Sequence, residues 1–372
     1  IKIGAIRRRF PAGLLGALVL ISAVEAGVAT SWISLTEPSA LAWPLARAAA
    51  VREAKGARIL CFGDSLAKHG VLPEVLEERL GEPAYSLALP ASTAPAHYFL
   101  LRRALNAGAK PRAMIVDYMP GLLTGTPPFG MPYWAGIVGP RDVAELAWSW
   151  PGRDFVAELL SHWLLPSYQS RHQIRESIAA AVRGRMTRTL ENNLMLRRNW
   201  RIHRGAQFTQ DNAIWDGIPT EAEHDRHLST RFWCHPLNKK YIHKFLGLAE
   251  SRGIRVYWVL PPVTPEIQRR RNESGADEKY SGFARAVAAG HPGVVILDAR
   301  PSGYDHTRFV DPIHLTGKGA LTLSADVAEA IAHAGPRWVT LPPYRDRTPG
   351  RPFEEVEQSR TEVLAGRETI RR

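Results

Sequence analysis

The chain has 372 residues, of which 45% are hydrophobic and 23% charged, the composition of an ordinary globular protein. A chain of this length can bury a full core, which excludes a disordered protein, a collagen-like fibre and a small disulfide-stapled scaffold. The net charge of +12 indicates an anionic neighbour such as a membrane surface, an acidic polymer or nucleic acid, and two cysteines are too few for a cysteine-based metal cluster.

The N-terminal segment is typical of a membrane anchor. Residues 11–36 contain a single charged residue, Glu25, and as a helix they would extend about 39 Å, more than the roughly 30 Å of a bilayer core. Basic residues are denser in segment 1–10 than after the helix, which predicts a cytoplasmic N-terminus and a body outside the cytoplasm. Two alternatives stay open: residues 14–24 as the apolar part of a cleaved signal peptide, or a helix buried in the core.

Residues 37–57 are interpreted as a linker, and residues 58–335 as one domain of alternating strands and helices. Short apolar runs separated by amphipathic helical segments are typical of a parallel sheet that is covered on both faces. We therefore predict an α/β fold with a flavodoxin-like, doubly wound, five-stranded parallel sheet and sites at the carboxyl ends of its strands. The strands are expected at residues 59–62, 84–89, 113–118, 254–260 and 294–298, and the helices at 65–80 (with a break near Gly70), 96–107, 237–251, 280–289 and 319–333.

The alternation stops over residues 121–234, which are interpreted as a helical insert rich in tryptophan and arginine. Its arginines are open to three interpretations: solvated helix faces, docking on anionic headgroups, or binding of an acidic polysaccharide. Nucleic acid is not expected as a partner outside the cytoplasm. Residues 336–372 combine five prolines with nearly balanced charge, which predicts a mostly disordered tail.

The first chemical motif, Gly63-Asp64-Ser65-Leu66, stands at the junction of the first strand and the first helix. A hydroxyl there lies at the carboxyl edge of the sheet, next to unpaired main-chain N–H groups that can stabilise an oxyanion. Gly63 permits a tight turn before it. The same residues also suit a plain helix cap, so this motif alone does not decide between catalysis and structure.

The second motif, Asp311-Pro312-Ile313-His314, lies between the last strand and the last helix. An acid three residues before a histidine can orient the imidazole, and the imidazole can accept the proton of a serine hydroxyl. Because the carboxyl ends of parallel strands meet at one edge, we expect Ser65 and His314 to lie together there.

With these two motifs the chain resembles the SGNH/GDSL hydrolase superfamily over residues 58–118 and 237–333. The resemblance implies that Ser65 is the nucleophile, His314 the general base and Asp311 its orienting acid, with no cofactor and no metal. Members of this superfamily are esterases, lipases, carbohydrate deacetylases and O-acyltransferases. An externally facing, membrane-anchored member is most similar to the branch that handles O-acetyl groups on cell-envelope polysaccharides. The implied partners are the membrane, an acylated polysaccharide and a membrane protein that donates acyl groups.

The chain departs from the superfamily where members have a glycine after the second strand and an asparagine after the third, both of which serve the oxyanion hole. Here residues 87–92 contain no glycine, and Asp117 follows the third strand. We expect the Ser65 N–H to be assisted by Ser92, its loop, or Tyr118, with Gly63 and Asp64 lining the site. Asp117 is expected to pair with Lys68 or an insert arginine, or to be protonated and donate. The alternative is a non-catalytic carbohydrate-binding or assembly module that keeps the fold.

Overall fold

The structure is a computed structural model that describes residues 12–30, 35–126, 132–150, 154–209, 220, 232–333 and 335–347. Its centre is an all-parallel sheet of six strands in the order β2-β1-β3-β4-β5-β6, and this confirms the α/β class. The order of the first five strands is that of doubly wound sheets in which function lies at the carboxyl edge. The strands are β1 (Ile59–Phe62), β2 (Ala84–Ser86), β3 (Ala113–Val116), β4 (Arg255–Leu260), β5 (Val294–Asp298) and β6 (Trp338–Thr340).

The sixth strand corrects the prediction of a five-stranded sheet, and it gives regular structure to the start of the segment 336–372, which was predicted to be mostly disordered. β6 pairs with β5 from Ile296↔Trp338 to Asp298↔Thr340, and the main chain of Tyr344 donates to the Ser302 carbonyl at 2.6 Å. A three-residue strand is too short to give a hydrophobic period, so tertiary pairing and not local pattern decides its conformation. Residues 348–372, the rest of the predicted tail, lie outside the described residues.

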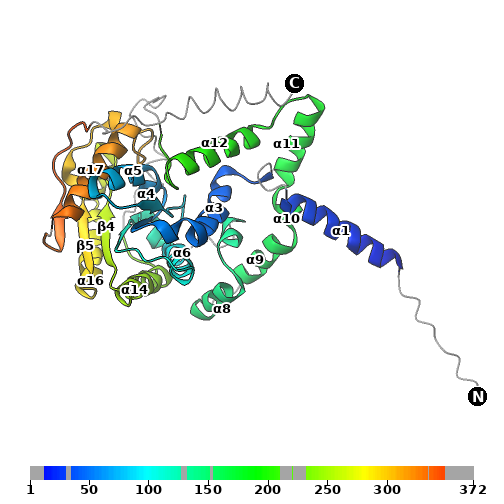
Figure 1. Cartoon of the computed structure of the whole chain (residues 1–372), viewed down its shortest axis with the longest axis horizontal. Helices are drawn as coiled ribbons and strands as arrows, with labels where there is room; N and C mark the ends of the chain where they lie inside the picture. The colour runs from blue at the N-terminus through cyan, green and yellow to red at the C-terminus, as the bar shows by residue number, and fades with distance from the viewer. Residues whose placement is uncertain are drawn as a thin grey trace, which may run out of the picture.

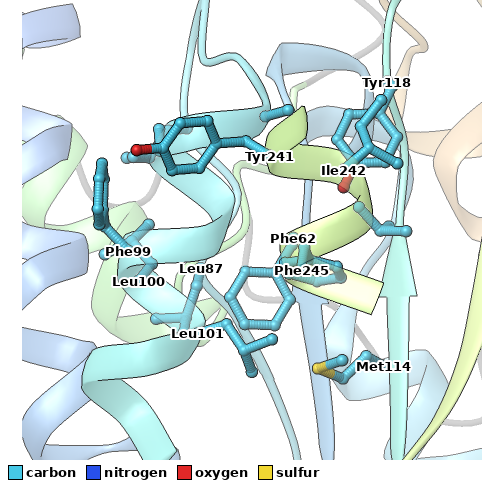
Figure 2. Packing of buried hydrophobic residues seen from close by; sticks show 14 of the residues in the cluster. Phe62, Leu87, Phe99, Leu100, Leu101, Met114, Tyr118, Tyr241, Ile242 and Phe245 are labelled. Carbon is cyan, nitrogen blue, oxygen red and sulfur yellow. The ribbon is translucent and has the colours of Figure 1, made fainter. Parts of the chain in front are cut away.

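Helices cover both faces of the sheet (Figure 1). One core packs α6, α14 and α16 against β1, β3 and β4, and Figure 2 shows Phe62 and Met114 of the sheet among Leu101, Phe245 and Tyr241 of these helices. The other core packs α5 and α17 on the opposite face. The helices of this layer structure are α4 (Ser65–Gly70), α5 (Pro73–Leu80), α6 (Ala94–Asn106), α14 (Pro236–Glu250), α15 (Pro265–Glu273), α16 (Ala276–Ala289) and α17 (Gly317–Ala332).

The segment predicted as a linker, residues 37–57, is instead mostly a buried helix, α3 (Pro38–Arg52). Leu41, Trp43 and Ala46 are fully buried, and the Trp43 ring packs against Trp134 with centroids 5.1 Å apart. The small alanine side chains let α3 pack closely on the rest of the core, although they carry little hydrophobic signal of their own. A short 3₁₀ turn, Ala54–Gly56, then leads into β1.

The described part of the insert is helical, as predicted. It leaves the sheet after β3 and returns to α14, and α8 to α11 extend to the right of the sheet in Figure 1. The segment from Arg204 to Thr209 runs back to the body, where Ser86 of the edge strand β2 donates its N–H to the Arg204 carbonyl at 2.9 Å. The elements are α7 (Pro120–Thr124), a 3₁₀ turn at Pro132–Gly136, α8 (Pro140–Ser149), α9 (Asp154–Leu164), α10 (Pro166–Gln169), α11 (Arg171–Val182) and α12 (Arg188–Ile202).

The N-terminal helix α1 (Ala12–Thr30) contacts α10 and extends away from the body (Figure 1). Glu25, the acid that interrupts its apolar sequence, accepts hydrogen bonds from the Ser167 N–H at 2.8 Å and from the Ser167 hydroxyl at 2.5 Å. Among the described helices none combines the length and apolarity needed to cross a lipid bilayer, so the transmembrane helix predicted over residues 11–36 is not found among them.

Candidate active site

The two chemical motifs meet at the carboxyl edge of the sheet. Ser65 begins α4 directly after β1, and His314 lies in the loop that leads to α17. The His314 Nε2 atom lies 2.8 Å from the Ser65 hydroxyl, and its Nδ1 atom lies 2.5 Å from Asp311 Oδ2. Because a carboxylate only accepts, Nδ1 carries the imidazole proton and Nε2 is free to accept from the serine. The arrangement can therefore move a proton from Ser65 to His314.

Asp311 is held as an ionised carboxylate. Its Oδ1 atom accepts the main-chain N–H groups of Ile313 and His314, both at 2.9 Å. Burial opposes ionisation, but the hydrogen bond from the His314 ring and these two N–H groups lower the pKa of Asp311 to about 2. The loop is closed by the Val310 N–H, which donates to the His314 carbonyl at 2.9 Å. Asp311 is thus fixed in the position from which it orients the histidine ring.

The turn before Ser65 depends on Gly63. Its φ of +139° lies in a region that residues with a Cβ rarely adopt, and a Cβ there would stand 1.6 Å from Asp117 Oδ1. The next residue, Asp64, caps α4 by accepting the Leu66 N–H at 2.8 Å, and its other oxygen accepts the Met119 N–H at 2.9 Å. Asp64 therefore ties the nucleophile turn to the loop after β3.

Asp117 supports this turn with a buried carboxyl group. It is 1% exposed, its Oδ1 accepts the Asp64 N–H at 2.9 Å, and its Oδ2 is shielded from solvent. Burial and the adjacent Asp64 carboxylate raise the pKa of Asp117 well above its usual range. Burial raises the pKa of Asp64 too, but the N–H groups of Leu66 and Met119 counteract this. Asp117 is thus the protonated member of the pair, and its shielded Oδ2 does not reach a substrate.

Of the two hydroxyls expected at the oxyanion hole, that of Ser92 is hydrogen-bonded elsewhere and that of Tyr118 is buried in the core. The Ser92 hydroxyl donates to the Gly63 carbonyl at 2.9 Å and lies 2.8 Å from Nε2 of the buried His97. Because burial lowers the pKa of His97 to about 3, this imidazole is neutral and donates from Nε2 to Ser92. The Tyr118 ring lies in the core beside Ile242 (Figure 2), with its hydroxyl buried. These side chains position the site and do not face the reacting atoms.

The loop before Ser92 lies against the nucleophile turn and is strained. The Leu89 N–H donates to the Gly63 carbonyl at 2.9 Å, which places the following residues beside that turn. Ala91 has a φ of +52°, in the left-handed region that glycine occupies without cost. This is the loop in which the superfamily resemblance implies a glycine, so the backbone bends there even though the glycine is absent.

Two further residues near the site come from the helix that Ser65 begins. The His69 ring lies 5.0 Å from the His314 ring, and its Nδ1 contacts the Thr209 hydroxyl at 2.9 Å. Burial, together with the neighbouring charges of His314 and Lys68, lowers the pKa of His69 well below its usual range. The spacing of four residues from Ser65, which puts both on one helix face, is the signal that could have identified His69.

Lys68 is fully buried, contrary to the exposed position that a helix lysine usually takes. Its ammonium donates to the Gly205 carbonyl at 3.0 Å and lies 3.9 Å from the centroid of the Trp200 ring. Burial lowers the pKa of Lys68 to about 7. It makes no contact with Asp117, so the expected pairing of these two residues is wrong. Lys68 instead holds the returning insert segment against α4.

The described residues contain no group of three or more His, Cys, Asp or Glu side chains arranged to hold a metal ion, and His224 and His227 lie outside them. Both cysteines, Cys61 and Cys234, are free.

Comparison with models of known protein families gives no match to this chain, and none of the curated proteins is significantly similar to it.

Proposed function

We propose that this protein is a serine esterase or O-acyltransferase of the SGNH type, acting on ester-linked acyl groups, acetyl above all, of an extracytoplasmic carbohydrate. The observation that carries the proposal is the continuous chain of contacts from Ser65 through His314 to Asp311, at 2.8 Å and 2.5 Å. Such a chain is what a serine hydroxyl needs in order to act as a nucleophile at neutral pH.

In the first step the Ser65 oxygen attacks the acyl carbonyl while His314 Nε2 takes the hydroxyl proton. Asp311 stabilises the imidazolium that forms. His314 then protonates the leaving alcohol, and the acyl group remains on Ser65. Attack by water completes hydrolysis, whereas attack by a sugar hydroxyl completes transfer, with His314 again relaying the proton. Transfer also requires an acyl donor, and in this proposal a membrane protein supplies it.

Main-chain N–H groups are the proposed oxyanion donors, because Ser92, Asp117 and Tyr118 are turned away. The Ser65 N–H stands at the start of α4, and the loop of Ala91 lies beside the same turn. A donor is effective at roughly 2.7–3.1 Å from the oxyanion. The absence of a side-chain donor among these three residues also supports the second candidate, a carbohydrate-binding or assembly module without turnover.

A fluorophosphonate probe and a generic acetyl ester separate the two candidates. The enzyme predicts labelling of the wild type, loss of labelling in Ser65→Ala, and loss of ester turnover in both Ser65→Ala and His314→Ala. Ser167→Ala, remote from the triad on α10, is the control and should be labelled like the wild type. A folded wild-type protein that hydrolyses no ester and takes no probe supports the binding module, and turnover that survives in clean Ser65→Ala contradicts the nucleophile.

We also propose attachment to a membrane through α1, with the body outside the cytoplasm. This helix exposes a continuous set of large apolar side chains, and an exposed set of this kind marks a contact with lipid or protein. Flotation with liposomes should recover the full chain and lose a form lacking residues 1–30. Equal flotation of both forms contradicts attachment through α1. The exposed side chains are Leu14, Leu15, Leu18, Val19, Leu20, Ile21 and Val24.

A further inference from the structure

A groove separate from the triad runs between α3, α12 and the start of the edge strand β2. Its volume is about 990 Å³, at the upper end of the range for ligand pockets in proteins. The side chains of Tyr85 and Trp200 help to line it, and the Trp200 indole N–H donates to the Tyr85 hydroxyl at 3.0 Å. Ser65, by contrast, lies at the carboxyl ends of the strands. The groove is therefore a second concave surface on the molecule.

The groove is strongly basic. Five arginines line it, namely Arg52, Arg197, Arg198, Arg201 and Arg204, and we call it the arginine groove. Glu53 is the only acid among its described lining residues. Arg204 also forms an ion pair with Glu77 of α5. Guanidinium groups concentrated in a concavity create a positive potential that attracts an anion.

The shape and lining favour one kind of anion. A bilayer surface is broad and contacts the projecting parts of a protein, whereas a groove admits a chain. The arginine groove combines guanidinium groups, which bind carboxylates in a bidentate manner, with aromatic and aliphatic side chains such as Trp200 and Leu45. A sugar chain that carries carboxylates offers both matching surfaces, because its rings are amphipathic and its charges recur along the chain. The volume of the arginine groove suits several sugar units better than one.

We propose that the arginine groove binds a stretch of an acidic, carboxylate-bearing polysaccharide. Binding needs no catalysis, whereas the statement that the bound chain is also the substrate rests on the proposed function. The groove and the nucleophile's helix are physically joined, since Trp200 lines the groove and its ring contacts Lys68, one turn after Ser65. Trp200 is thus shared between the lining of the groove and the packing around the helix that positions Ser65.

The test measures binding of the full chain, kept in a mild non-ionic detergent, to polygalacturonate, with neutral dextran as the uncharged comparison. The double variant Arg197→Gln/Arg201→Gln should bind polygalacturonate about tenfold more weakly or worse, since two charge-assisted contacts are lost. The matched control is Arg175→Gln/Arg185→Gln, which removes the same charge from exposed insert positions outside the groove and should bind within about twofold of the wild type. Thermal unfolding checks that both variants fold.

Three results overturn the proposal: no binding of polygalacturonate at low ionic strength, equal loss in the two double variants, or equal binding of dextran. Tighter binding of phosphatidylglycerol vesicles or of single-stranded DNA, with the same dependence on Arg197 and Arg201, also overturns it, because the groove then serves a membrane or a nucleic acid. Ser65→Ala should bind like the wild type. Polygalacturonate binding by a chain that proves inactive on every ester removes the proposed function alone.

Discussion

The substitution Asp117→Asn tests the electrostatics beneath the nucleophile turn. An asparagine keeps the size of the side chain and an oxygen that can accept the Asp64 N–H, which lies 2.9 Å from Asp117 Oδ1 in the wild type. It replaces the O–H group that we assign to Asp117 by an amide NH2 group, which does not titrate. In the unfolded chain this carboxyl ionises near its ordinary pKa of about 3.9, whereas in the folded chain burial and Asp64 raise the pKa well above its usual range. Folding of the wild type therefore takes up one proton that folding of the variant does not.

This proton fixes both the sign and the size of the expected effect. An acid that binds its proton more tightly when folded contributes stability below its unfolded pKa, and this contribution decreases as the pH rises toward the folded pKa. One proton corresponds to about 1.36 kcal/mol per pH unit, so relative to the wild type Asp117→Asn should gain about 2.7 kcal/mol over two units in which folded Asp117 stays protonated.

The measurement is urea unfolding of both proteins at pH 5, 6 and 7, followed by tryptophan fluorescence. Glu158→Gln, at an exposed position of α9, is the control, and its difference from the wild type should stay flat with pH. A flat difference for Asp117→Asn as well would falsify the protonated assignment, because folded Asp117 would then be ionised at pH 5 just as in the unfolded chain.

Three further outcomes follow from the same site. Lys68→Met removes a buried amine whose pKa is about 7. Between this folded pKa and the higher unfolded pKa only the unfolded chain carries the proton, so the stability of the wild type rises with pH. In urea unfolding from pH 7 to 9, the free energy of unfolding of the wild type should therefore increase relative to that of the variant by about 1.4 kcal/mol per pH unit. Ala91→Gly should stabilise the fold by about 0.5–1 kcal/mol in the same assay, because relief of left-handed strain exceeds the entropy cost of glycine, and a loss of stability would contradict this. Asp311→Asn should lower ester turnover by roughly 10³–10⁴-fold without abolishing it, since Ser65 and His314 remain; an unchanged rate would contradict the orienting role.

The parallel sheet could be predicted because its strands are buried on both faces and so appear as apolar runs. The meeting of Ser65 and His314 follows from the same topology, since both motifs end up at the carboxyl edge of one sheet. The break between α4 and α5 was also predictable, because Pro73 begins a helix and does not continue one. These features depend on short stretches of sequence and on rules that hold for parallel sheets in general.

The rest depends on contacts between distant residues. Strand β6 exists because β5 offers an unpaired edge, and α3 is buried because Trp43 fits against Trp134. Neither effect leaves a local period in the sequence. The burial of Lys68 likewise requires Trp200, which is far away in the chain. Residue identity suggested oxyanion donors at Ser92 and Tyr118. The Ser92 hydroxyl instead donates to the Gly63 carbonyl and the Tyr118 hydroxyl is buried in the core, and only the tertiary structure fixes these positions.

The replacement of the expected asparagine by Asp117 is best understood together with Gly63. The two are matched in space, because a Cβ on residue 63 would overlap the Asp117 carboxyl, and Asp117 in turn accepts the N–H of Asp64. The cost of burying this carboxyl is reduced both by its protonation and by the hydrogen bond from the Asp64 N–H, so that it supports the turn. The strain at Ala91 points the same way, since that loop keeps a glycine-like bend without a glycine. Both departures leave the backbone around Ser65 in place, which is why we propose main-chain N–H groups as the oxyanion donors of this site.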